Sequence, residues 1–154
     1  MNYNQINFLL SGNGTSVQVP PKKLIGDIDI RGRMKLHEEI YDFEEELEKV
    51  RLKLAKLFQT VQDKYRIKVL DIDGNPTLDP RQQPVYETED TIENGETKKI
   101  FKLTDRVAYD KDVKELFDSE VTFKSKFTPS LLEGVVQIGK LEYRWLRELD
   151  LLKH

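Results

Sequence analysis

The 154-residue chain contains no cysteine, and only two of its residues are histidine. A chain without cysteine cannot form a disulfide framework, a thiolate zinc site or a cysteine nucleophile. Long apolar runs are also missing, because no run exceeds three residues, as in Phe8-Leu9-Leu10. The sequence therefore predicts neither a membrane span nor a secretory signal.

The charge of the chain is nearly balanced, with 25 Lys and Arg against 28 Asp and Glu and a net charge of −3. This balance predicts no general attraction to polyanions, and the sequence contains no recognised nucleic-acid-binding motif. Charged residues make up 34% of the chain and hydrophobic residues 38%. Such a composition is lean for a thick core and typical of long helices exposed to solvent.

Residues 33–66 are predicted to form one long amphipathic helix. Apolar residues recur there at alternating spacings of four and three over almost four heptads, with no glycine or proline between them. The helix would be roughly 50 Å long, and it cannot bury its own apolar stripe. We call this stripe the helical seam; it consists of Leu36, Ile40, Phe43, Leu47, Val50, Leu54, Leu57 and Val61.

The regions on either side of this helix are predicted to contain β-structure. Residues 1–32 form an irregular or β lead-in, with a hairpin around Gly12-Asn13-Gly14. Residues 67–127 form a β-rich middle region with a short helix, whose N-cap is expected at Asp110, followed by a strand at 120–123.

The clearest hairpin of the middle region spans residues 85–104. Asn94-Gly95 is typical of a type I′ turn, because both turn positions need a positive φ. Closing the turn there pairs Thr88 with Phe101 and puts Ile92 and Phe101 on one apolar face. The opposite face is mostly charged.

A second amphipathic helix is predicted over residues 128–154. Thr128-Pro129 is typical of a helix start, and apolar residues then recur at helical spacing as far as Leu152. The expected fold class is α+β: two long amphipathic helices form an antiparallel helical pair, with a β-hairpin-rich middle, in a single domain of residues 1–154. The sequence shows no internal repeat.

The second helix is about ten residues shorter than the first, so part of the helical seam would be left for a partner. Acidic residues gather in residues 38–48 and basic residues in residues 49–56, which suits an antiparallel self-pair. We therefore expect a homo-oligomer or a stable complex with another protein. The alternative is a monomer in which the β layer covers the rest of the seam.

Few residues combine in a way that indicates chemistry. Asp71, Asp73 and Asn75 alternate as in the start of a calcium loop, but Pro76 stands where that loop needs glycine, which favours a simple turn and leaves ion binding open. His37 has no nucleophile or orienting partner at a suitable spacing. We expect no catalytic residue, no cofactor and no metal site.

Tyr143 and Trp145, flanked by arginines, have the composition of a protein-binding hot spot if they are exposed. Packing of Trp145 in the core is the alternative. Both interpretations place them on the C-terminal helix.

The order of several short motifs resembles a known group of proteins. Gly32-Arg33 precedes a charged helix, Asp63-Lys64-Tyr65 leads into Asp71-Ile72-Asp73-Gly74-Asn75-Pro76, and Lys114-Glu115-Leu116-Phe117 precedes Glu120-Val121-Thr122-Phe123. This order resembles a family of uncharacterised small proteins encoded by tailed phages and prophages of Gram-positive bacteria. The hairpin at Asn94-Gly95 and the N-terminal segment depart from the family pattern, and the family implies no catalytic residue.

The expected function is that of a non-enzymatic phage protein that acts through protein–protein contacts, as a virion, assembly or accessory component. It would reside in the cytoplasm of the bacterial host or in the virion. One alternative is a small inhibitor of a host defence or metabolic enzyme, in which acidic residues 38–48 imitate a polyanion. Another is a nucleic-acid-associated accessory protein, although nucleic-acid binding is not favoured by the charge balance.

Overall fold

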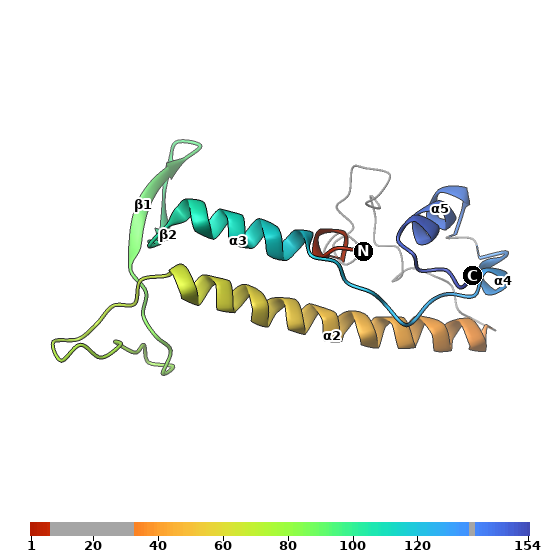
Figure 1. The fold of residues 1–154 in the computed structure, drawn as a ribbon, viewed down its shortest axis with the longest axis horizontal. Helices are drawn as coiled ribbons and strands as arrows, with labels where there is room; N and C mark the ends of the chain where they lie inside the picture. Colours follow the sequence, from red (N-terminus) through yellow and green to blue (C-terminus); the bar gives the residue numbers. More distant parts are fainter. Residues whose placement is uncertain (7–32, 136–137) are drawn as a thin grey trace. The chain divides into compact units, whose positions relative to one another are not determined.

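The computed structural model describes residues 1–6, 33–135 and 138–154 (Figure 1). Its contacts divide the chain into two compact units: unit 1 contains residues 1–55 and 116–154, and unit 2 contains residues 56–115. Helices and a two-stranded antiparallel sheet are both present, which confirms the α+β class. The elements are, in chain order, α2 (Met34–Tyr65), β1 (Thr88–Glu93), β2 (Glu96–Phe101), α3 (Arg106–Asp118), α4 (Pro129–Leu132) and α5 (Lys140–Glu148).

Helix α2 is the predicted long helix, and its ends lie within one residue of the predicted ones. Side chains four residues apart support it on its exposed face, for example Lys49 Nζ and Glu45 Oε1 at 2.6 Å. Within unit 1, the helical seam points into the core. The buried seam residues are Leu36, Ile40, Phe43, Leu47 and Leu54.

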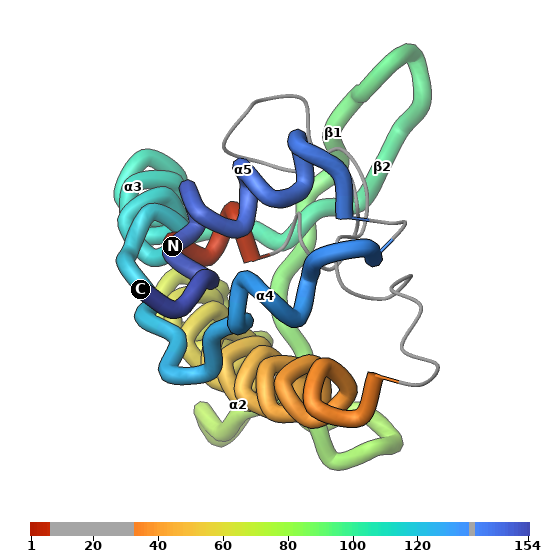
Figure 2. Tube along the Cα trace, turned by 90° about the vertical axis from the view of Figure 1, so that its right-hand side faces the viewer, coloured from red at the N-terminus to blue at the C-terminus, as the bar shows by residue number. Residues whose placement is uncertain are grey.

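The core of unit 1 forms where α2 meets the extended segment of residues 119–128, which we call the strap. Phe43 of α2 is fully buried, and its ring centroid lies 5.2 Å from that of Phe123 and 5.3 Å from that of Phe127. Figures 1 and 2 show α4 and α5 on the same side of the first half of α2. These elements cover the seam with apolar side chains, including Trp145 and Leu146.

The prediction of a continuous C-terminal helix from Thr128 to Leu152 is wrong. Two short helices, α4 and α5, replace it. Helix α4 ends because Glu133 is extended and Gly134 has a φ of +71°, a conformation that glycine adopts without strain. Helix α5 begins after the extended residue Gly139, whose N–H donates to the Glu142 carboxylate at 3.0 Å.

Beyond α5, the chain returns to the strap as an extended segment. Asp150 has a φ of +55°, which ends the helical conformation. The Phe127 N–H then donates to the Leu151 carbonyl at 2.7 Å, and the Lys153 N–H donates to the Phe127 carbonyl at 2.9 Å. One long amphipathic helix is therefore present in the described part of the chain, and it has no long antiparallel partner there.

In unit 2, the predicted hairpin and its register are confirmed. Thr88 pairs with Phe101, and Asn94 and Gly95 have φ values of 53° and 81°, as a type I′ turn requires. The predicted apolar face also includes Tyr86 and Leu103 and is covered only in part: these two side chains are half-buried, whereas Ile92 and Phe101 are exposed. Within the two strands, the half-buried side chains are Thr91 and Ile100 on the opposite face.

Two smaller predictions need correction, and a third concerns residues that the structure describes only in part. Helix α3 begins at Arg106, four residues before the expected N-cap, because Asp105 caps it by accepting the Ala108 N–H at 3.0 Å. The predicted strand at 120–123 is reduced to a single bridge between Glu120 and Asn2. Residues 3–6 are helical, and the rest of the predicted N-terminal hairpin lies outside the described residues.

Candidate interaction surfaces

The segment between α2 and β1 folds into two tight turns of the same kind, which we call the double turn (residues 69–85). The first turn spans Leu70 to Pro76 and the second spans Leu78 to Pro84, and each pair forms an antiparallel bridge. The corresponding positions are eight residues apart, so the chain does contain an internal repeat. The prediction that the sequence has no internal repeat is therefore wrong. The repeat is hard to detect in the sequence because it has only two copies, each with Leu-Asp followed by a proline.

An aspartate organises each of these turns. Asp71 Oδ1 accepts the N–H groups of Asp73 and Asn75, both at 2.9 Å. Asp79 Oδ1 accepts the N–H groups of Arg81 and Gln83 at 2.8 and 2.9 Å. These are side-chain-to-backbone bonds of the Asx-turn type, which hold the loop backbone without a buried core.

A closed ring of backbone hydrogen bonds joins the two turns. The Thr77 N–H donates to the Val69 carbonyl, the Val85 N–H donates to Thr77, and the Val69 N–H donates to Val85, at 2.8 to 2.9 Å. The three residues are spaced by eight, so the ring follows the period of the repeat. The ring fixes both turns relative to each other within unit 2.

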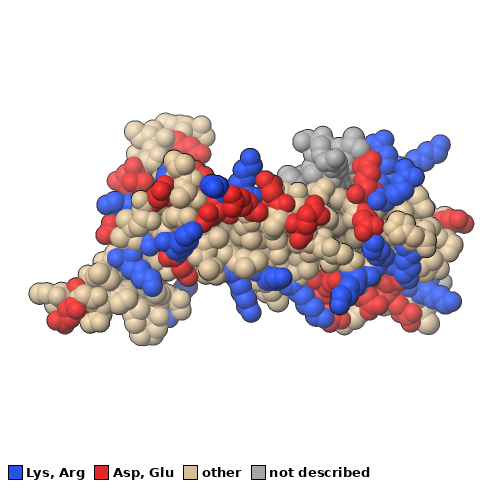
Figure 3. Space-filling model, in the orientation of Figure 1, with Lys and Arg blue, Asp and Glu red and all other residues tan. Residues whose placement is uncertain are grey.

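The double turn carries large apolar side chains at its surface. Ile72 is 100% exposed, Leu70 56% and Leu78 49%. We call these three residues the apolar tip. The projection at the lower left of Figure 3, where this segment lies in Figure 1, shows more uncharged surface than charged surface. Sequence reasoning missed this feature, although the recurrence of Leu-Asp at 70–71 and 78–79 was the available signal.

Aromatic and charged side chains support the base of the double turn within unit 2. The Arg66 guanidinium lies 3.9 Å from the ring centroid of Phe101, and the Tyr86 hydroxyl donates to Asp63 at 2.7 Å. The buried Tyr65 donates its hydroxyl to Asp112 at 2.7 Å. Lys64 Nζ also binds the Asp112 carboxylate. The hydrogen bond from Lys64 lowers the pKa of Asp112 most, and the hydrogen bond from the Tyr65 hydroxyl lowers it further.

The chain itself covers most of the predicted helical seam. Five of its eight residues are buried, Val50 and Val61 are half-buried, and Leu57 is 38% exposed. A partner is therefore not needed to cover the first half of the seam. Association of a second copy through the remaining positions stays a prediction.

The two residues of the predicted hot spot, Tyr143 and Trp145, differ in their burial. Trp145 is buried in the core of unit 1, and its Nε1 has no hydrogen-bond partner among the described residues. Tyr143 lies on the surface of the same helix, α5. The alternative prediction, that Trp145 packs in the core, is confirmed.

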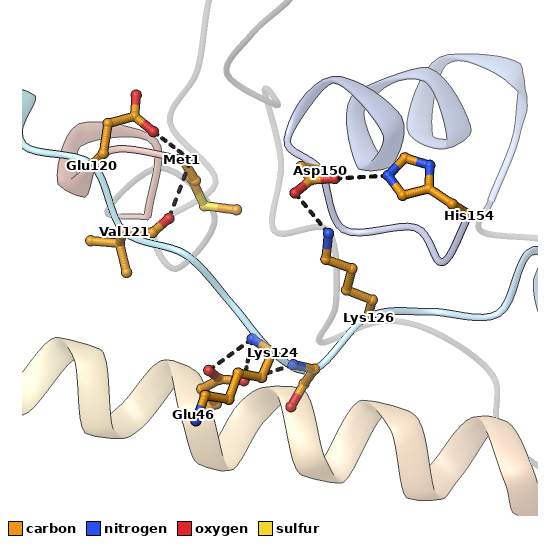
Figure 4. A network of polar contacts seen from close by, with 9 residues as sticks. Met1, Glu46, Glu120, Val121, Lys124, Lys126, Asp150 and His154 are labelled. Atoms are coloured by element: carbon orange, nitrogen blue, oxygen red, sulfur yellow. Dashed lines mark hydrogen bonds and ion pairs between the residues drawn. The ribbon is translucent and has the colours of Figure 1, made fainter.

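Two residues of the acidic stretch 38–48, Glu39 and Glu46, form hydrogen bonds or ion pairs with other segments of unit 1. Glu39 accepts the Thr128 N–H at 2.8 Å and pairs with Lys153, and Glu46 accepts the N–H groups of Lys124 and Ser125 (Figure 4). Burial raises the pKa of Glu46, but these backbone N–H groups outweigh burial and hold the pKa below its usual 4.5. Both acidic and basic side chains appear on the face drawn in Figure 3. The other acidic residues of this stretch are exposed, so imitation of a polyanion stays a prediction; they are Glu38, Asp42, Glu44, Glu45 and Glu48.

Asp71, Asp73 and Asn75 all belong to the first turn of the double turn. No group of three or more metal-binding His, Cys, Asp or Glu side chains occurs among the residues that the structure describes. Asp71 instead directs its Oδ1 to its own loop backbone. None of the described helices is both long and apolar enough to span a bilayer.

Comparisons of the chain with protein-family models, with curated proteins and with solved structures found no match.

Proposed function

We propose that this protein acts through protein–protein contacts, as a structural or assembly component of a phage particle, and that the apolar tip is its binding element. The observation that carries the proposal is the exposure of Leu70, Ile72 and Leu78 on a loop whose backbone is held by its own hydrogen bonds. The phage context rests on the resemblance of the short motifs described above.

Ordering of the backbone favours a binding role for the double turn. A loop that must become ordered when it binds loses conformational entropy, which weakens the complex. The Asp71 and Asp79 turns and the three-bond ring keep the double turn in one conformation before binding. The apolar side chains are therefore presented at a smaller entropic cost than on an unstructured loop.

The position of the apolar residues also favours binding over a folding role. None of the three contributes to the core, whose clustered buried residues all belong to unit 1. Each side chain would lose water contact when it enters a partner's pocket, and this contributes about 1 kcal/mol or more per residue. Three large apolar side chains exposed within nine residues of one short segment favour an interaction surface.

The test compares the wild-type chain with a variant carrying Leu70→Ser, Ile72→Ser and Leu78→Ser. Each protein is immobilised and exposed to extracts of phage-producing cells, and the retained proteins are quantified by mass spectrometry. We expect wild type to retain a phage structural protein and the tip variant to retain at least tenfold less of it, since the three truncations together remove about 3 kcal/mol.

The control is a variant with three other exposed apolar residues replaced, each about half exposed or more: Tyr41→Ser, Leu52→Ser and Val107→Ser. Circular dichroism shows whether both variants keep the helical content of wild type. Equal loss of the retained protein in both variants would contradict a specific role of the apolar tip. Tip-dependent retention of a host enzyme alone would overturn the assembly role and assign the apolar tip to a host partner.

A further inference from the structure

The β1–β2 hairpin of unit 2 has two open edges. Each strand has one hydrogen-bonded neighbour, the other strand, and no third strand joins the sheet within the described part of the chain. An open edge presents unpaired backbone N–H and C=O groups, which can form hydrogen bonds with a strand of another chain. The free edges of β1 and β2 are therefore candidate binding sites for another strand, separate from the apolar tip.

The two edges differ in charge. Strand β1 carries three acidic side chains and no basic one, which gives it a charge of −3. Strand β2 carries two lysines and one glutamate, which gives it a charge of +1, and Lys102 follows directly. The strands therefore differ in sign. Because Glu89 pairs with Arg106 and Glu93 pairs with Lys98 in the same chain, Asp90 is the β1 carboxylate without an ion-pair partner among the described residues.

We propose that the β1 edge of one copy pairs with the β2 edge of a second copy, so that the hairpins join into one continuous antiparallel sheet. A two-fold arrangement would place β1 against β1, both strands carrying −3, or β2 against β2, both strands carrying +1, and like charges on facing strands are destabilising. The head-to-tail arrangement places the −3 strand beside the +1 strand. Charge therefore selects this arrangement over the symmetric one.

Side chains of the hairpin are long enough to pair across neighbouring strands. Lys98 and Glu93 pair at 2.7 Å, and Lys102 and Glu87 pair at 3.3 Å. Asp90 and Lys99 face each other in the register, yet neither forms an ion pair with another described residue. These two central charges remain available to the strands of neighbouring copies.

The proposed contact has a consequence for assembly. The two surfaces of a head-to-tail contact are different, so each bound copy still presents a free edge. Association therefore continues beyond two copies and ends only when a ring closes. If Asp90 of one copy lies opposite Lys99 of the next, the register inside the hairpin is repeated between copies, and the exposed Ile92 faces Thr97 of a neighbour.

Crosslinking of introduced cysteines distinguishes the two arrangements, because the chain contains no other thiol. Ile92→Cys places a thiol on β1, and Thr97→Cys places one on β2, without a change of charge. A short bis-maleimide reagent is added to each variant alone and to an equal mixture in which one variant is isotope-labelled. We expect the mixed dimer to exceed either homodimer severalfold.

Lys111→Cys on the exposed face of α3 supplies the collisional background for this experiment. Homodimers of Ile92→Cys or of Thr97→Cys that equal the mixed dimer would overturn the head-to-tail arrangement. A mixed dimer no more abundant than the Lys111→Cys dimer would overturn pairing of the hairpins altogether.

Charge reversal supplies a second measurement, made by sedimentation velocity over a range of concentrations. Asp90→Lys or Lys99→Asp alone should weaken self-association about tenfold, since each replaces an attraction by a repulsion. The double swap Asp90→Lys/Lys99→Asp restores opposite charges at this pair within and between copies but leaves each strand with a charge of −1, so it should recover part of the association. No recovery in the double swap would count against the proposal.

The two proposals fail separately. The apolar-tip variant Leu70→Ser/Ile72→Ser/Leu78→Ser should self-associate as wild type does, because the hairpin edges are unchanged. Loss of self-association in this variant would assign the contact between copies to the tip and overturn pairing through the edges.

Discussion

The repeated turns of unit 2 allow a prediction with opposite signs at two equivalent positions. Gly74 and Gln82 occupy the same place in the first and second turn, with φ values of +82° and +61°. Glycine adopts this left-handed conformation freely, whereas glutamine does not. We predict that Gln82→Gly stabilises the double turn and that Gly74→Gln destabilises it.

The size of the effect follows from the backbone alone. The left-handed conformation costs a residue with a Cβ atom about 1–2 kcal/mol, and the greater freedom of glycine in the unfolded chain offsets about 0.5–1 kcal/mol of this. A Cβ atom at Gly74 would meet no atom within 4 Å, so no clash adds to the cost. The side chain of Gln82 is exposed, so little packing is lost with it. The expected change is about 0.5–1 kcal/mol in each direction.

Hydrogen exchange of the ring amides measures this change locally. The N–H groups of Thr77 and Val85 belong to the three-bond ring, so their protection reports opening of the double turn. We expect about two- to fivefold slower exchange in Gln82→Gly, about two- to fivefold faster exchange in Gly74→Gln, and near-wild-type exchange in the double variant. Changes of the same sign in both single variants would refute the equivalence of the two turns.

Two further predictions concern unit 1, where Trp145, the only tryptophan, reports unfolding by its fluorescence in urea. Phe43→Ala should lower the free energy of unfolding by about 3–5 kcal/mol, whereas Leu52→Ala, at a half-exposed position of the same helix within unit 1, should cost less than about 1 kcal/mol. Glu46→Gln should cost about 1–2 kcal/mol at neutral pH, because two backbone N–H groups lose a charged acceptor. Since the pKa of Glu46 is lowered in the folded state, its contribution is complete above pH 4.5 and is lost as the pH falls through the lowered pKa. The difference between wild type and Glu46→Gln should therefore shrink in acid, and a constant difference would contradict this role.

Local patterns predicted the parts of the fold that depend on local interactions. The seam spacing predicted α2 to within one residue, and Asn94-Gly95 predicted both the turn and the register of the hairpin. In both cases the deciding signal lies within the element itself. The turn chemistry at Asn94-Gly95 depends on two residues only, and the helix depends on a period repeated many times.

The predictions failed where long-range packing or a single backbone position decides the structure. Apolar spacing in residues 128–154 suggested one helix, but Gly134 takes a left-handed φ and lets the chain fold back over the seam. The burial of Leu151 and Leu152 therefore comes from an extended segment that pairs with the strap, and not from a helix. Helical spacing could not reveal this, since buried residues in either conformation are apolar.

The distribution of buried residues explains why both proposed contact surfaces, the apolar tip and the hairpin edges, lie in unit 2. Of the buried apolar residues, Tyr65 alone belongs to this unit among the described residues. A two-stranded hairpin without a core is marginally stable in water, and the double turn is held mainly by hydrogen bonds. Contacts with another chain would supply the apolar burial that unit 2 lacks. Any partner that binds the folded form alone also stabilises it in proportion to the logarithm of its concentration. Binding through the tip and pairing of the hairpin edges would therefore both stabilise unit 2 while leaving the core of unit 1 unchanged.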